Sequence, residues 1–251
     1  MEKKISLLLL QIFCFVTILL SQTYQVTYIE EKNFSGVKGF EERYKSELSF
    51  NSKEWINYST FLETGKPKGE YDEDFRKKTK FEYIHFPTKE MVLETDAKGK
   101  YTFIKDSLIV PKWEIILDST KLIGDYVCSF AKTEYLGRVY EVWFANDIIS
   151  NAGPWRLCSL PGLILEAKSL DGVYNVTFVS LKKVDNKSIL KPKITPEISK
   201  KEFLIHIQKE MAKLKRDMKS IISEDRNSDI SFDMNYSIPD LDKTLNNGNV
   251  K

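Results

Sequence analysis

The sequence predicts a mainly β protein, a single antiparallel meander or half-barrel sheet with one C-terminal amphipathic helix packed on it. Three observations lead to this prediction. Between residues 24 and 184 the chain runs in short stretches of alternating polar and apolar residues, rich in aromatic and β-branched side chains. Turn-forming residues separate these stretches at short intervals. After Pro192 the apolar spacing changes to alternate steps of three and four, as in a helix.

The first 22 residues have the features of a cleavable secretory signal peptide. A basic start at Lys3 and Lys4 precedes an almost wholly apolar run over residues 5–20. An uncleaved membrane anchor is the alternative, since that run approaches the roughly 18 residues that span a bilayer. Gln11 interrupts the run, however, and no basic cluster follows it. We therefore expect an exported protein, periplasmic or secreted.

The rest of the chain has the size of a single domain, expected over residues 23–223. Its charge is balanced, because the full chain has 38 Lys and Arg against 36 Asp and Glu, and it contains no dense basic block. Proteins that bind nucleic acid carry a basic patch, so nucleic acid is not expected as a partner. Residues 224–251 are rich in Asn, Asp and Ser with little periodicity, which predicts a flexible tail.

Each strand is expected from its own alternation. In the stretch 44–50 the side chains of Tyr44, Ser46, Leu48 and Phe50 share one face. The other expected strands are 25–29, 55–61, 81–86, 90–96, 101–110, 113–116, 163–168 and 173–184. Asp171-Gly172 predicts a tight hairpin between the last two, because glycine accepts a positive φ without strain.

One helix is expected over residues 195–223. Thr195 offers an N-cap, and Pro196 takes the first helical position. The apolar stripe of this helix consists of Ile207, Met211, Leu214, Met218 and Ile221. We expect the stripe to cover a face of the sheet. Contact of its basic face with an anionic membrane is the alternative, which Glu210 and Asp217 weaken.

Removal of the leader leaves two cysteines, Cys128 and Cys158. An even pair in an exported protein favours a disulfide. Such a bridge would close a loop of about 30 residues and add about 3 kcal/mol of stability. Two buried, inert thiols are the alternative.

Reactive groups are scarce. His85 lies within an expected strand and His206 within the expected helix, and both are interpreted as structural residues. A pair of Cys128 with His85 would compete with the disulfide. The acidic run Asp72-Glu73-Asp74 is interpreted as a solvated loop, and no cysteine or histidine spacing matches a metal site. No metal, cofactor or enzymatic activity is therefore expected.

One segment differs from the rest. Gly153-Pro154 and Pro161-Gly162 are two turn-forming dipeptides that enclose an aromatic residue, a cation and a cysteine. A type II turn at Pro161-Gly162 would lead into the strand 163–168, so the segment could be a corner at the edge of the sheet. The residues of this segment that are candidates for binding are Gly153, Pro154, Trp155, Arg156, Leu160, Pro161 and Gly162.

The same residues resemble the signature of the GLPGLI family, exported proteins of Bacteroidetes. Gly153-Pro154-Trp155 and the string Leu-Pro-Gly-Leu-Ile-Leu-Glu at 160–166 match it, and the segments 123–128 and 142–148 are similar upstream. Ser159 stands where the family has its first glycine, which suggests that this position needs no positive φ. The resemblance implies an envelope protein and no particular activity.

Three functions are compatible with these features. We expect a non-catalytic binding or carrier module that encloses a hydrophobic small molecule or peptide between sheet and helix. The first alternative is a partner of an outer-membrane transport or secretion machine, bound through a strand edge or the turn at 153–162. The second is a cysteine-dependent hydrolase, for which the sequence lacks a complete set of catalytic groups.

Overall fold

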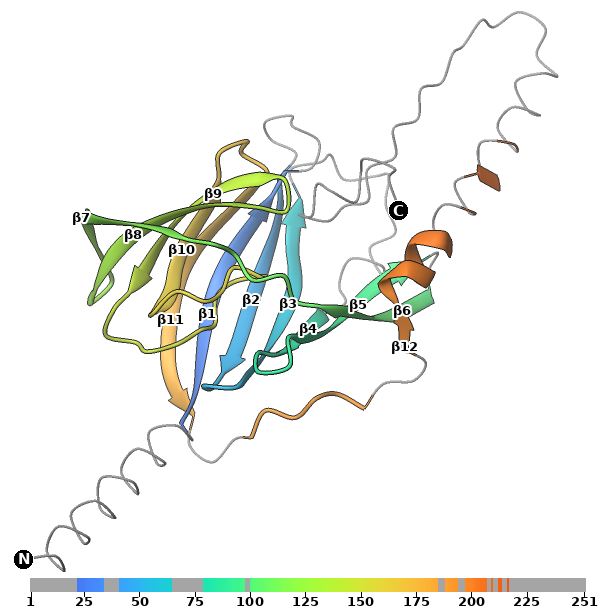
Figure 1. Ribbon diagram of the computed structural model, residues 1–251, viewed down its shortest axis with the longest axis horizontal. Coiled ribbons are helices and arrows are strands. Elements are labelled where there is room, and N and C mark those ends of the chain that lie inside the picture. The colour runs from blue at the N-terminus through green and yellow to red at the C-terminus, as the bar shows by residue number, and fades with distance from the viewer. Residues whose placement is uncertain are drawn as a thin grey trace, which may run out of the picture.

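The computed structural model describes residues 22–33, 41–64, 79–97, 100–184, 188–193, 197–206, 209, 212–213 and 216. Within them, twelve strands form one sheet in the order β12-β6-β5-β4-β3-β2-β1-β11-β10-β9-β8-β7 (Figure 1). The strands are β1 Thr23–Lys32, β2 Glu42–Phe50, β3 Glu54–Thr64, β4 Thr79–His85, β5 Glu90–Ala97, β6 Lys100–Ser107, β7 Glu114–Ile123, β8 Tyr126–Tyr135, β9 Arg138–Ala145, β10 Leu163–Ser169, β11 Tyr174–Val184 and β12 Glu197–Ser199.

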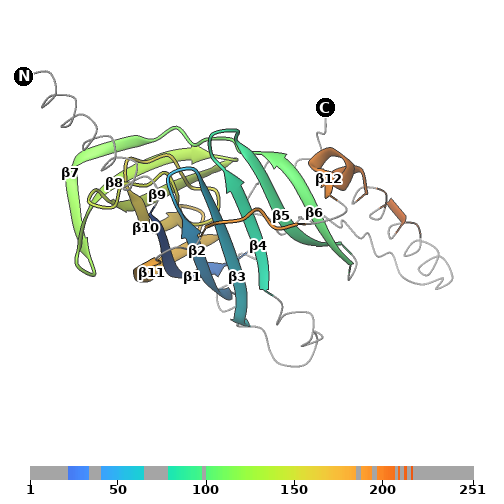
Figure 2. The same ribbon diagram turned by 90° about the horizontal axis from the view of Figure 1, so that it is seen from below.

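The sheet is built from two meanders that meet in its middle. Strands β1 to β6 follow one another towards one edge, β7 to β11 return from the other, and β11 closes the sheet by pairing with β1. Figure 2 shows β7 and β6 far apart at the two ends of the bent sheet. The prediction of a single antiparallel meander or half-barrel is therefore wrong. The cause is the long-range β1–β11 pairing, which local alternation does not encode.

The C-terminal part also differs from the prediction. Residues 197–199 form β12, which pairs with β6 in parallel, and the helix begins only at residue 200. Ser199 caps it: the Ser199 amide and hydroxyl donate to a carboxylate oxygen of Glu202, and the Glu202 amide donates back to the Ser199 hydroxyl. The expected cap at Thr195 and the expected apolar stripe lie outside the described residues.

The core lies on one face of the sheet, called here the inner face. It includes Leu48 and Phe50, which are fully or almost fully buried together with Ser46, so the predicted shared face of β2 is confirmed for these three side chains. The connection between β9 and β10, residues 146–162, contributes side chains to the same core. The opposite face is called the outer face.

One further expectation can be compared with the described residues. The β10–β11 hairpin turns at Gly172, whose φ is 73°, as the Asp-Gly dipeptide predicts. No helix among the described residues is long and apolar enough to cross a membrane. The leader, the acidic run 72–74 and the tail 224–251 lie outside the described residues.

Candidate functional site

The segment that stands out in the sequence is buried. Trp155 is 8% exposed, and its ring lies 5.7 Å from that of Tyr135, 6.0 Å from Tyr140 and 6.3 Å from Tyr174, centroid to centroid. The candidate residues Gly153, Pro154, Leu160 and Gly162 are also buried, and only Pro161 is exposed. The connection therefore fills the inner face of the sheet and presents little surface to a ligand.

Arg156 fixes this connection to the other half of the sheet. Its Nε lies 2.9 Å from Oε1 of Glu82 on β4, and the two side chains are only 6% and 13% exposed. The guanidinium also lies 5.3 Å from the ring centroid of Trp155. Both charges have lost most of their contact with water, which is costly. The attraction between them offsets that cost. The pair is therefore a structural brace between the two meanders.

The backbone of the connection corrects two predictions. Ser159 has a φ of 73°, so the prediction that this position needs no positive φ is wrong. Gly162 is not among the residues with positive φ, so the predicted type II turn is not formed. Glycine is needed at 162 for space, because a Cβ atom there would overlap the carbonyl oxygen of Ala145. A Cβ atom at position 153 would likewise overlap the carbonyl oxygen of Leu157.

The two cysteines are free and buried, so the structure does not support the predicted disulfide and corresponds to the alternative of two inert thiols. The Sγ of Cys128 donates to the carbonyl of Tyr126 at 3.6 Å. Burial raises the pKa of Cys128 to about 11 and that of Cys158 to about 12. Little reactive thiolate forms at neutral pH. His85 bonds instead to the hydroxyl of Thr88, with 2.7 Å between Nδ1 and Oγ1.

A second buried polar group lies at the end of β1. Glu30 is 1% exposed and pairs with Lys32 at 3.1 Å. The Lys32 ammonium lies between two rings, 4.8 Å from the centroid of Tyr44 and 5.9 Å from that of Tyr174. Burial, with the charge of Glu30 nearby, holds the pKa of Tyr174 well above its usual value. This group was missed by sequence reasoning, although Tyr28, Glu30 and Lys32 alternate along one strand.

The outer face carries a half-buried aromatic pair. Phe130 on β8 lies directly opposite Trp143 on β9, with ring centroids 4.8 Å apart. Lysine ammonium groups flank both rings, Lys121 at 5.8 Å from the Trp143 centroid and Lys132 at 5.3 Å from that of Phe130. The outer aromatic patch consists of Phe130, Trp143, Lys121, Lys132, Glu141 and Glu166.

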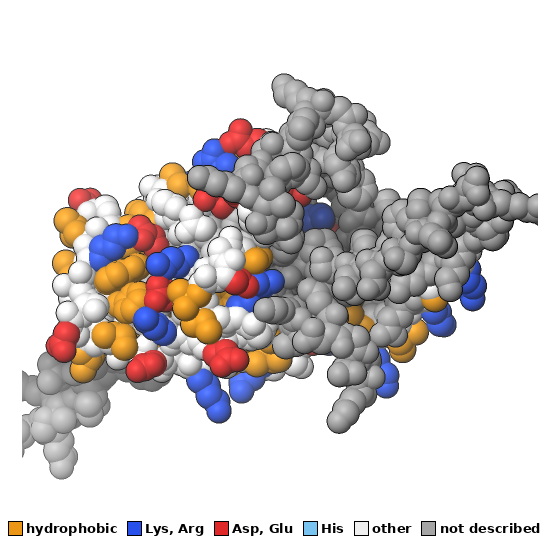
Figure 3. Space-filling view, turned by 90° about the horizontal axis from the view of Figure 1, so that it is seen from above, with side chains coloured by type: hydrophobic (Ala, Val, Ile, Leu, Met, Phe, Trp, Pro, Cys, Tyr) orange, Lys and Arg blue, Asp and Glu red, His pale blue; other side chains and the backbone are white. Residues whose placement is uncertain are grey.

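Ion pairs order the charged rim of the outer aromatic patch. Glu141 lies 2.8 Å from Lys132 and 3.0 Å from Lys168, while Glu166 lies 2.5 Å from Lys121. Hydrogen bonds from the two lysines hold the pKa of Glu141 below its usual value, so the carboxylate stays charged. Figure 3 shows hydrophobic side chains interleaved with basic and acidic ones at the end of the molecule that bears β7 to β10.

The outer aromatic patch offers two kinds of contact at once. The rings provide an apolar stacking surface, and the carboxylates and ammonium groups provide acceptors and donors around it. Among the described residues, no group of three or more His, Cys, Asp or Glu could hold a metal ion. The arrangement therefore suits an uncharged polar ligand with one apolar side. On each of the two strands an aromatic and a charged residue stand two positions apart, Phe130 with Lys132 and Trp143 with Glu141. This spacing is the sequence signal that could have revealed the outer aromatic patch.

A family described as "N-glycanase peptide, N-terminal domain" matches residues 75–222, more than half of the chain. The chain belongs to this family. The expectation of a protein without an enzymatic role is therefore wrong, because the family is the N-terminal part of an enzyme, an N-glycanase. No curated protein matches the chain.

Two solved structures are similar to the chain. PNGF-II in space group C2 has a TM-score of 0.50 and 19% identity, over 73% of this chain and 32% of that one. PNGF-II in space group P21 has a TM-score of 0.45 and 20% identity, over 72% and 31%. At such identity the likeness to the first shows the fold alone. The chain spans about a third of the length of PNGF-II. Neither result supports or contradicts the resemblance to the GLPGLI family.

Proposed function

We propose that this chain is the glycan-recognising part of an N-glycanase-type enzyme, and that the outer aromatic patch contacts the carbohydrate of a glycoprotein. Family membership supports the class of ligand, since an N-glycanase is named for N-linked glycans. The observation that supports the location is the pair of Phe130 and Trp143, set among three carboxylate–ammonium ion pairs.

The chemistry of a sugar fits the outer aromatic patch. A pyranose has an apolar C–H side, which can lie on the ring of Trp143, and hydroxyl groups at its rim, which can bond to Glu141 and Glu166. The lysine partners, Lys121 and Lys168, have side chains that are 43% and 59% exposed, while those of Glu166 and Glu141 are 26% and 15% exposed. Because the two ammonium groups are largely hydrated, a hydroxyl group can replace one of them at low cost.

This proposal changes the class of ligand expected from the sequence. The chain is still proposed to be a binding module, but its proposed ligand is a glycan and not a hydrophobic small molecule or peptide. Glycoproteins with N-linked glycans occur outside the bacterial cytoplasm, which fits an exported protein, periplasmic or secreted. The signal peptide at 1–22, the domain at 23–223 and the tail at 224–251 remain part of the proposal.

Binding to one glycoprotein in two states tests the proposed function. Isothermal titration would compare an N-glycosylated protein with the same protein after enzymatic removal of its glycans. We expect binding to the first and none to the second, and competition by the released glycan. Equal affinity for both states would contradict a glycan-recognising role. Incubation of the glycoprotein with the chain, followed by mass determination, reads out any release of glycan in parallel.

A further inference from the structure

Residues 188–193 pack on the outer face of the sheet, and residues 197–206 lie at its β6 edge; together they are called here the strap. On the outer face, Ile189 is 5% exposed and packs with Ile56 and Tyr83. At the edge, β12 extends the sheet beside Phe103 to Lys105. Beyond β12, Phe203 is 6% exposed and packs with Ile104.

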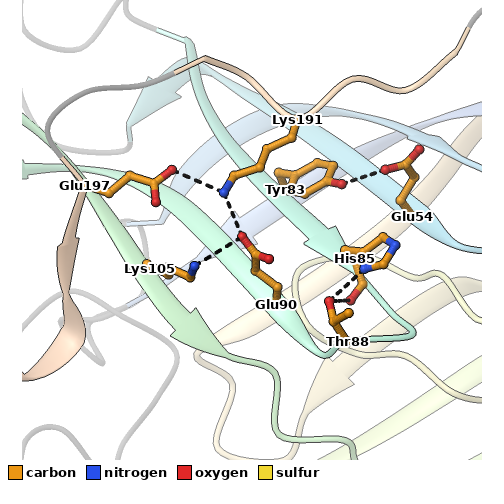
Figure 4. Close-up of polar contacts among 8 residues, drawn as sticks. All are labelled: Glu54, Tyr83, His85, Thr88, Glu90, Lys105, Lys191 and Glu197. Atoms are coloured by element: carbon orange, nitrogen blue, oxygen red, sulfur yellow. Dashed lines mark hydrogen bonds and ion pairs between the residues drawn. The ribbon is translucent and has the colours of Figure 1, made fainter.

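Ion pairs connect the strap to the sheet (Figure 4). The ammonium group of Lys191 lies 2.7 Å from the carboxylate of Glu90 on β5 and 3.3 Å from that of Glu197 on β12. Lys105 approaches the same Glu90 oxygen at 3.7 Å. Further along, Lys200 lies 3.1 Å from Asp106 at the end of β6. The sheet therefore offers two carboxylates, Glu90 and Asp106, to lysines of the strap.

The strap is attached at the margin of the main core. Ile189 and Phe203 belong to two small apolar clusters, and the cluster of Phe203 meets the large cluster of the inner face at Leu93. Within the described part of the strap, the strand contact spans three residues, 197–199. The side chains of the Lys191–Glu90 pair are 35% and 28% exposed, so solvent and salt weaken it. Segments attached in this way open locally without unfolding of the remaining domain.

We propose that the β6 edge is a docking site for an extended, lysine-bearing polypeptide segment, and that the strap occupies this site in the free protein. An open strand edge presents a row of backbone donors and acceptors that an added strand can pair with. The strap shows which side chains fit this edge. Ile198 lies opposite Ile104, and Lys200, two positions later in the strap, pairs with Asp106. The partner segment has the same pattern, a β-branched residue followed two positions later by lysine.

This docking site is independent of the glycan-binding proposal. The β6 edge and the outer aromatic patch on β8 and β9 lie towards opposite ends of the strand order. Loss of one site leaves the other intact, so each can be tested without the other. The β6 edge would bind polypeptide, and the outer aromatic patch would bind sugar.

A labelled synthetic peptide with the sequence of residues 188–206 tests the proposal on the full chain by fluorescence anisotropy. Lys191→Glu places like charges beside Glu90 and opens the strap, so this variant should bind the peptide about tenfold more tightly than the unchanged chain. Phe203→Ala opens the strap by loss of an apolar contact and should act in the same direction. A peptide carrying Ile198→Asp should not bind.

The outcomes are separated by a control for folding. Both variants should keep the urea midpoint of the sheet, measured by tryptophan fluorescence, because the main core is untouched. Binding that appears on opening of the strap and disappears with the altered peptide supports a docking edge. Absence of peptide binding to both folded variants would overturn the proposal. Equal binding of the altered peptide would also overturn it, because the β-branched side chain opposite Ile104 would then contribute nothing to the contact.

Discussion

Arg156→Met should destabilise the protein strongly, because it removes the cation that faces the buried carboxylate of Glu82. The side chains of this pair are 6% and 13% exposed and 2.9 Å apart. Loss of one partner from such a buried pair costs about 3–5 kcal/mol. Folded domains are stable by only about 5–15 kcal/mol, so the variant loses a large share of its free energy of unfolding.

Urea unfolding, followed by tryptophan fluorescence, measures this loss. A second variant with Arg156→Met and Glu82→Leu removes both charges and should be more stable than the single variant, since neither charge of the pair remains in the core. Arg43→Met is the matched control: its pair with Glu63 is 43% and 60% exposed, and its loss should cost below about 1 kcal/mol. A cost for Arg156→Met as small as that of the control would refute the role of the pair as a structural brace.

Three further predictions concern Ser159, the two buried cysteines and the strap. Ser159→Gly should raise the free energy of unfolding by about 0.5–1 kcal/mol, because glycine adopts a positive φ without strain; a lower urea midpoint would contradict this. Cys128 and Cys158 should resist alkylation by iodoacetamide at neutral pH until urea is added, since burial raises both pKa values to about 11 and about 12; rapid reaction of the folded protein would disprove their burial. The hydrogen bond from Lys191 lowers the pKa of Glu90. The stability that this pair gives the strap is therefore complete above the ordinary pKa of glutamate, and it is lost as the pH falls through the lowered pKa. The hydrogen-exchange protection factors of the strap amides should therefore fall with decreasing pH before those of the β2 amides do, and a simultaneous fall would contradict local opening.

Local patterns predicted the parts of the fold that depend on neighbours in sequence. Ser46, Leu48 and Phe50 share a buried face because side chains alternate along any strand, and Gly172 turns a hairpin because of its own backbone freedom. The pairing of β1 with β11 depends on residues about 150 positions apart, and alternation says nothing about which strands become partners.

The outer aromatic patch could not be predicted from the sequence either, because it also depends on which strands pair. Phe130 and Trp143 become a pair only when the register of β8 and β9 places them opposite each other. The turn-rich segment at 153–162 attracted attention because of its composition, but its residues fill the inner face. Ser159 shows the limit of composition most directly, since a serine holds the backbone conformation that glycine favours.

The affinity of Trp143→Ala for an N-glycosylated protein tests the central claim most directly. Trp143 supplies the larger ring of the outer aromatic patch, so its loss should raise the dissociation constant about tenfold or more, by isothermal titration. Tyr58→Ala removes a 42% exposed ring on β3, outside the outer aromatic patch, and should leave the affinity unchanged. Unchanged affinity in Trp143→Ala, with binding by the unaltered chain intact, would contradict the proposed site.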